Sequence, residues 1–156
     1  MSETADDHPG VVIFPPLLFV ICVVGGAIGH FSCPYRLPMS PWIRVSWGAL
    51  ALGSIAFAIW GQRTMKAAGT NVHPGMPALA IVELGPFKFT RNPLYLSLIA
   101  LFTAIGSALA SPAFLLLVVP LVFVLHFGVV LREERYLEAK FGDAYRGYKA
   151  RVRRWI

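Results

Sequence analysis

Charged residues are scarce in this chain of 156 residues. They make up 14% of it, whereas a soluble domain usually carries about 25%. No Asp, Glu, Lys or Arg occurs in the 40 residues from Asn92 to Leu131. Because about 20 mostly apolar residues cross a bilayer as one helix, this stretch is long enough to cross twice. The composition excludes a soluble, disordered or fibrous protein and predicts an integral membrane protein with a single domain over residues 1–156.

Cysteine is also scarce, which limits the metal and disulfide chemistry that the chain can support. The two cysteines, Cys22 and Cys33, have no CxxC neighbour, so we expect structural roles for them and predict no metal site. The sequence also has no phosphate-binding glycine loop, no Ser-His-Asp order and no zinc signature.

Four apolar runs account for the membrane part of the chain. They predict an all-α polytopic membrane protein with four transmembrane helices, joined by a reentrant-like connection and followed by an interfacial helical tail. Pro120 lies inside the fourth run and predicts a kink or a local gap there. The predicted spans are residues 11–31, 45–61, 94–110 and 113–131.

The distribution of positive charge indicates which side the loops face. Eight of the 14 basic residues lie between Arg132 and Arg154, directly after the last apolar run. Basic residues beside a membrane helix indicate the cytoplasmic side and contact with anionic lipid headgroups. The net charge of the chain is +6, and we expect its basic residues to contact membrane lipids and not nucleic acid. With four crossings, both termini and the 62–93 connection are predicted to be cytoplasmic.

The acidic start (Glu3, Asp6) lacks the basic region of a secretory signal, so the first apolar run is interpreted as a permanent helix.

The connection before the third run is too long for a simple linker and too apolar for a disordered one. Its prolines and glycines forbid one continuous helix, which suggests a loop folded over a ligand. Asn92-Pro93 marks the start of the third helix, where free amide donors favour a negatively charged ligand group. A helix cap with a reentrant loop explains the same pattern equally well. His73 lies in this connection, whereas His30 and His126 are interpreted as packing residues.

Two glutamates begin the polar tail. Glu133 and Glu134 follow the fourth span, and acidic groups at the end of a helix oppose its dipole, so they need a cationic partner. Nearby arginines or the hydroxyls and ammonium of a ligand can fill this role. For the tail as a whole we expect anchoring at the membrane surface, with four side chains facing the interface: Leu137, Phe141, Tyr145 and Tyr148.

Three sequence elements together resemble a known family. The run Gly85-Pro-Phe-Lys-Phe-Thr-Arg-Asn-Pro-Leu-Tyr95 is followed by Glu133-Glu134 and then by Phe141-Gly142-x-x-Tyr145-x-x-Tyr148-x-x-Arg151-Val152. This ordered combination, spread over residues 70–152, closely resembles the isoprenylcysteine carboxyl methyltransferase family and is shared with phospholipid N-methyltransferases. The first half of the chain matches only as hydrophobic helices.

The resemblance implies an S-adenosylmethionine-dependent methyltransferase embedded in the membrane. Its cofactor segments fall on residues 70–95 and 131–152. Phe87 stands where tyrosine is common, and Asn92 stands where many carboxyl methyltransferases have histidine. The predicted catalytic residues are Arg91, Glu134 and Arg135. The implied cofactor-binding residues are Ala80, Ile81, Val82, Gly85, Phe87, Asn92, Pro93, Leu94, Tyr95 and Glu133.

The chemistry of methyl transfer agrees with these residue types. Displacement at a sulfonium needs alignment more than a covalent nucleophile, and an aromatic face such as that of Phe87 can accommodate the cation. Glu133 can accept hydrogen bonds from the hydroxyls or amino group of the cofactor, and Arg91 or Arg135 can orient a carboxylate acceptor.

The expected substrate is a lipophilic or prenylated small molecule with an isoprenylcysteine-type carboxylate. We expect its methylation at the cytoplasmic face of the membrane, and we expect this membrane to be a prokaryotic inner membrane. Three alternatives remain: a phospholipid N-methyltransferase, a nicotinamide-dependent membrane reductase and a non-enzymatic membrane scaffold.

Overall fold

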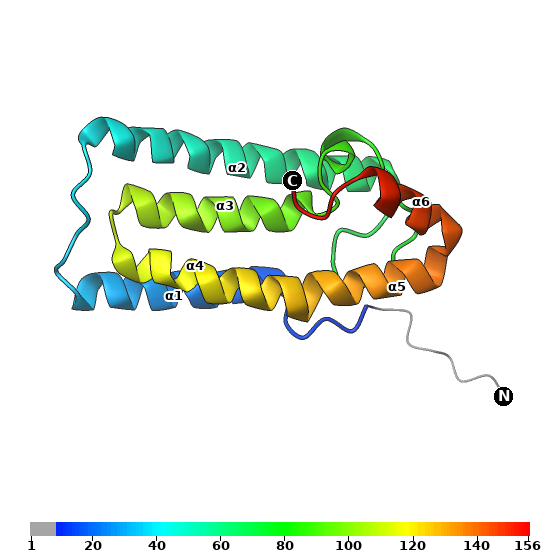
Figure 1. The fold of residues 1–156 in the computed structure, drawn as a ribbon, viewed down its shortest axis with the longest axis horizontal. Coiled ribbons are helices and arrows are strands. Elements are labelled where there is room, and N and C mark those ends of the chain that lie inside the picture. Colours follow the sequence, from blue (N-terminus) through cyan, green and yellow to red (C-terminus); the bar gives the residue numbers. More distant parts are fainter. Residues whose placement is uncertain (1–8) are drawn as a thin grey trace.

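The structure, a computed structural model, describes residues 9–156, and this part of the chain is helical without a β-strand. Four helices run roughly alongside one another, and the last of them continues into the polar tail (Figure 1). The prediction of an all-α protein is confirmed. The acidic residues used to interpret the amino terminus lie outside the described range. The elements in chain order are α1 (Pro15–Ser32), α2 (Pro41–Ala67), the 3₁₀ turn η1 (Gly85–Lys88), α3 (Pro93–Ala108), α4 (Pro112–Phe123), the π-helix η2 (Val124–Val130), α5 (Leu131–Phe141) and α6 (Asp143–Arg151).

The predicted spans agree with these helices to within a few residues, except that α2 is longer at both ends. α2 begins at Pro41 because Ser40 Oγ accepts a hydrogen bond from Ile43 N at 3.4 Å, which caps the helix. Arg44, outside the apolar run, donates from Nε to Ala108 O at 2.9 Å and ties α2 to the end of α3.

Three helical stretches are long and apolar enough to cross a membrane, namely α1, α2 and the continuous helix Pro112–Phe141. With 16 residues, α3 is shorter and would span about 24 Å at 1.5 Å per residue. A fourth crossing through α3 therefore stays a prediction.

Small residues allow α1 and α4 to pack closely. A Cβ atom added to Gly26 of α1 would lie 2.8 Å from the ring of Phe114 in α4. Close approach of backbones through small residues is the usual packing mode of membrane helices. The core around this contact also contains Phe102, Leu121 and Leu125, which are fully buried.

The fourth helix changes its geometry after Pro120. Proline has no N–H to donate within a helix, and four residues later the helix widens into η2. Gly128 O accepts a hydrogen bond from Val12 N at 3.0 Å, and Arg132 Nη1 donates to Gly10 O at 3.1 Å, so residues 10–12 pack against the wide turn. Because a π turn holds more residues than an α turn, η2 changes the direction in which every later side chain points.

The polar tail folds back over one end of the bundle (Figure 1). Gly142 separates α5 from α6 with a φ of 53°, which glycine adopts without strain. Tyr145 and Tyr148 of α6 are only 2% and 3% exposed, and Tyr148 Oη donates to Phe87 O at 2.9 Å. The prediction that these two tyrosines face the membrane interface is therefore wrong. The aromatic face of α6 packs against the protein, next to η1.

Candidate functional site

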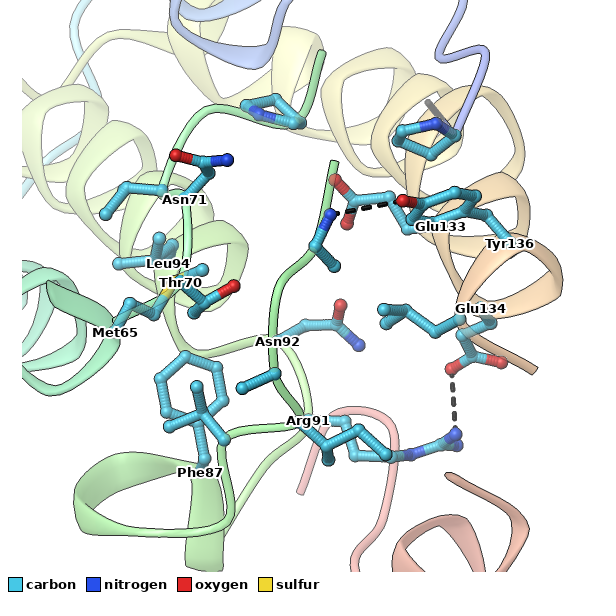
Figure 2. Close-up of a pocket in the computed structure, with 18 of the residues that line it drawn as sticks. Met65, Thr70, Asn71, Phe87, Arg91, Asn92, Leu94, Glu133, Glu134 and Tyr136 are labelled. Carbon is cyan, nitrogen blue, oxygen red and sulfur yellow. Dashed lines mark hydrogen bonds and ion pairs between the residues drawn. The ribbon is translucent and has the colours of Figure 1, made fainter. Parts of the chain in front are cut away.

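A cavity lies where the 70–95 segment meets the start of the tail. It holds about 900 Å³ of empty space, counting the space at its open mouth, and its lining is mostly apolar. Figure 2 shows Phe87, Arg91, Asn92, Glu133 and Glu134 arranged around this space. Segments that are about forty residues apart in the sequence therefore form one site.

The first wall is the apolar strip of Ala80, Ile81 and Val82 together with the loop that precedes it. Polar side chains hold this loop in shape. Thr70 Oγ1 accepts a hydrogen bond from Leu79 N at 3.0 Å, and Asn71 Nδ2 donates to Pro77 O at 2.9 Å.

The loop that precedes the strip is also attached to α5. Ala78 N donates to Tyr136 Oη at 3.1 Å, an interaction visible in Figure 2. The loop is therefore an ordered part of the wall.

The 3₁₀ turn η1 brings Phe87 to the cavity, where its side chain is 8% exposed. Gly85 starts this turn with a φ of 58°, and a Cβ there would lie 2.7 Å from Thr64 Oγ1 of α2. Gly85 is thus required for the close approach of η1 to α2 and does not line the cavity itself.

The start of α3 forms the next part of the wall. Asn92, Pro93, Leu94 and Tyr95 all line the cavity. Asn92 is held from two sides, because its N–H donates to Thr90 Oγ1 at 3.2 Å and its Nδ2 donates to a backbone carbonyl of the carboxyl-terminal segment at 2.9 Å. The backbone N–H and the side-chain amide of Asn92 therefore already have partners in the protein.

The acidic pair faces this helix start, and the two glutamates have different surroundings. Tyr95 Oη donates to Glu133 Oε1 at 2.6 Å. Glu133 Oε2 makes no hydrogen bond with any described residue and is free to accept one from a ligand. Glu134 is 5% exposed and both of its oxygens are paired with arginines.

These arginines are Arg91 and Arg154. Arg154 binds Glu134 with two parallel hydrogen bonds, Nε to Oε1 and Nη2 to Oε2, each 2.9 Å long. The hydrogen bond to Glu134 raises the pKa of Arg154 above its ordinary value. Arg91 Nη1 lies 3.1 Å from Glu134 Oε1, but Nε and Nη1 of Arg91 have no partner with hydrogen-bond geometry among the described residues. The Arg91 side chain is only 7% exposed, and Arg91 is one of the residues that line the cavity.

Tyr145 and Tyr148 complete the wall from α6. Burial raises the pKa of Tyr145 to about 12, the charge of Glu134 adds to this effect, and the charge of Arg91 opposes it. Burial also raises the pKa of Tyr148 well above its usual range. Both phenols therefore stay protonated at neutral pH and can donate hydrogen bonds.

Arg135 is not brought to the cavity. Its side chain is exposed and donates from Nε to Leu131 O at 3.2 Å. The physical reason is helical phase, since Arg135 points about 100° away from Glu134 around α5. The sequence analysis missed three cavity residues that it had assigned to the membrane interface, namely Leu137, Tyr145 and Tyr148. It also missed Arg154, which no local pattern indicated.

His73 and His126 each have a hydrogen-bond partner within the protein. His73 lines the cavity, its Nδ1 accepts from Gly75 N at 3.0 Å, and its ring stacks on Phe14 at 4.6 Å. His126 Nδ1 accepts from Trp155 Nε1 at 3.4 Å. In the described part of the chain no group of three His, Cys, Asp or Glu side chains is arranged to hold a metal ion.

A comparison with protein families identifies the group to which the chain is related. A family described as "Phospholipid methyltransferase" matches residues 43–144, about two thirds of the chain. This chain belongs to the phospholipid methyltransferase family. An uncharacterized protein of Haemophilus influenzae (strain ATCC 51907 / DSM 11121 / KW20 / Rd) is 43% identical to it over 63 residues, which are 40% of this chain and all of that relative.

Because the chain belongs to this family, its class is that of a membrane methyltransferase, which agrees with its apolar helices. Membership favours this interpretation over a reductase or a scaffold. The match ends at residue 144. The cavity residues Tyr145 and Tyr148, and Arg154, which pairs with Glu134, therefore lie beyond the matched segment.

Proposed function

We propose that this family member transfers a methyl group from S-adenosylmethionine to a lipophilic acceptor at the cytoplasmic face of the membrane. The proposal rests on one observation, which is the convergence of the 80–82 strip, the start of α3 and the Glu133–Glu134 pair on one cavity. The family description supports the reaction class.

The polar groups of the cavity match the functional groups of the methyl donor. Glu133 Oε2 is a free acceptor that suits ribose hydroxyls or an ammonium group. The Arg91 guanidinium suits a carboxylate, because its Nε and Nη1 have no partner with hydrogen-bond geometry among the described residues. The ring of Phe87 offers an aromatic face to a sulfonium.

When bound, S-adenosylmethionine would supply an activated methyl group on its sulfonium. The chain's contribution is alignment and exclusion of water, because displacement at such a carbon needs no covalent nucleophile. The lining of the cavity is mostly apolar, and the hydrogen bond from Tyr148 Oη to the backbone carbonyl of Phe87 holds that residue in place. Arg91 and Glu133 would orient the two ends of the donor.

For the acceptor we propose an isoprenylcysteine-type carboxylate, and the family description supports a phospholipid amine as the second candidate. A carboxylate acceptor needs no base. An amine must first lose a proton, and His73 is poorly prepared to take it because its Nδ1 already accepts the Gly75 N–H.

The experiment is a binding titration followed by product analysis. The purified protein in lipid nanodiscs should bind S-adenosylmethionine and S-adenosylhomocysteine and should not bind a nicotinamide dinucleotide. It is then incubated with a bacterial lipid extract, or with S-farnesylcysteine, and isotopically labelled S-adenosylmethionine. Mass spectrometry should find a labelled methyl ester or a labelled phospholipid headgroup. Absence of binding to both adenosyl compounds in nanodiscs and in detergent would contradict the proposal.

A further inference from the structure

The carboxyl-terminal segment crosses the start of α3 and is bonded to it. Arg91 N donates to Arg153 O at 3.0 Å. Arg154 O accepts two hydrogen bonds, from Thr90 Oγ1 at 3.1 Å and from Asn92 Nδ2 at 2.9 Å. In Figure 1 the chain returns in this region from α6 toward the α2 and α3 helices. The backbone of the segment is therefore fixed beside the cavity wall.

These bonds aim the side chain of Arg154 at Glu134. The two-bond contact takes Oε1 and Oε2 of Glu134 together, at 2.9 Å each. Such bidentate pairs fix geometry as well as charge. The Arg154 side chain is 32% exposed, whereas Glu134 is 7% exposed, so the carboxylate is buried and its partner reaches it from the surface.

Sharing of Glu134 between two arginines leaves Arg91 incompletely paired. Glu134 carries one negative charge for two guanidinium groups, and Arg91 contacts it through Nη1 alone, at 3.1 Å. Nε and Nη1 of Arg91 have no hydrogen-bond partner among residues 9–156 although they are buried. Buried donors without a partner are costly, and Arg91 is one of the residues that line the cavity.

We propose that Arg154 is a positioning residue that keeps Arg91 available for a carboxylate of the ligand by saturating Glu134. Without Arg154, both oxygens of Glu134 would be free to form a bidentate pair with Arg91 at low dielectric, which would take the Arg91 donors away from the cavity. The proposal rests on the proposed function, because it concerns the same ligand. The carboxylate has two possible sources, the amino-acid part of the methyl donor or the acid group of the acceptor.

The test compares ligands with and without a carboxylate in lipid nanodiscs. One pair is S-adenosylhomocysteine and 5′-methylthioadenosine, which lacks the amino-acid part. The other pair is S-farnesylcysteine and its methyl ester. Calorimetric titrations are made with the wild type, Arg154→Gln and the control Arg153→Gln. The control removes a neighbouring charge from an exposed side chain that makes no ion pair or side-chain hydrogen bond in the described chain.

Arg154→Gln should weaken binding of the carboxylate-bearing member of one pair by roughly tenfold, about the effect of one charge-assisted hydrogen bond, and leave the other member unchanged. The affected pair identifies the source of the carboxylate. Equal weakening of both members, or no weakening of either pair relative to Arg153→Gln, would overturn the proposal. Failure of the wild type to bind any adenosyl compound would instead contradict the proposed function, and this proposal would fall with it.

Two further variants separate positioning from a general loss of structure. The double variant Arg154→Gln/Glu134→Gln should bind the carboxylate ligand more tightly than Arg154→Gln, because Arg91 no longer has a carboxylate to pair with. Should Arg154→Gln fail to fold, Arg154→Lys serves in its place, since an ammonium cannot reproduce the two-bond contact. A double variant that binds no better than the single one would show that Arg154 does not act through Glu134.

Discussion

Replacing Glu133 by glutamine removes a charge from the cavity wall while keeping the shape of the side chain. In the wild type, Oε1 accepts the hydrogen bond from Tyr95 Oη at 2.6 Å and Oε2 is left for the ligand. In Glu133→Gln, the amide oxygen can still accept from Tyr95, so the amide NH₂ would face the cavity. The ligand donors would then lose a charged acceptor and meet another donor.

The expected loss follows from the energy of hydrogen bonds to charged groups. One such bond contributes about 2 kcal/mol, so the dissociation constant for S-adenosylhomocysteine should rise roughly 30-fold. The matched control is Glu138→Gln on the same helix, since Glu138 pairs with Lys149 and Arg146 at the surface and does not line the cavity.

The assay is isothermal titration calorimetry in lipid nanodiscs, with thermal unfolding of the ligand-free proteins to check that each variant is folded. Glu138→Gln should bind with an affinity close to that of the wild type. A folded Glu133→Gln variant whose affinity stays within about twofold of the wild type, a difference of roughly 0.4 kcal/mol, would refute the role assigned to Glu133.

Three other predictions concern the stability of the fold. Tyr148→Phe removes a buried hydrogen bond to a carbonyl of η1 and should lower the free energy of unfolding by about 1 kcal/mol in denaturant titrations; an unchanged value would contradict its contribution. The pKa of Tyr145 is about 12 in the folded protein and about 10 in the unfolded chain, so its contribution to the free energy of unfolding is complete below about pH 10 and is lost as the pH rises through about 12. Tyr145→Phe should therefore reduce the decline in melting temperature at alkaline pH, and a pH profile identical to that of the wild type would contradict this prediction. Gly26→Ala places a Cβ 2.8 Å from the Phe114 ring and should destabilise the protein by about 1–3 kcal/mol through overpacking, whereas Gly25→Ala, with 3.5 Å to its nearest neighbour, should not.

Much of the helical architecture was predictable, because apolar runs and proline positions are local features. The uncharged stretch from Asn92 to Leu131 contains both α3 and α4. Pro93 and Pro112 each begin a helix, where a missing N–H has no cost. By contrast, the π-helix after Pro120 was not predictable, since its wide turn is accompanied by a contact from the distant Val12.

The site was predictable in its main parts and not in its details. Glu133 and Glu134 could be paired with the start of α3 because the combination of motifs is specific. An aromatic stripe such as that of Tyr145 and Tyr148 indicates that side chains share a face, but it does not indicate whether that face meets lipid or protein. The position of Arg154 depends on the return of the chain after α6, for which the local sequence carries no signal.

The central claim is that the 80–82 strip, the start of α3 and Glu133 surround one adenosyl ligand. The most direct test is an experimental structure of the protein in a lipid nanodisc with S-adenosylhomocysteine. We expect the ligand in the cavity beside Phe87, with a hydroxyl or ammonium on Glu133. A ligand bound elsewhere, for example against the apolar surface formed by Val118, Val122 and Phe127, would contradict the claim.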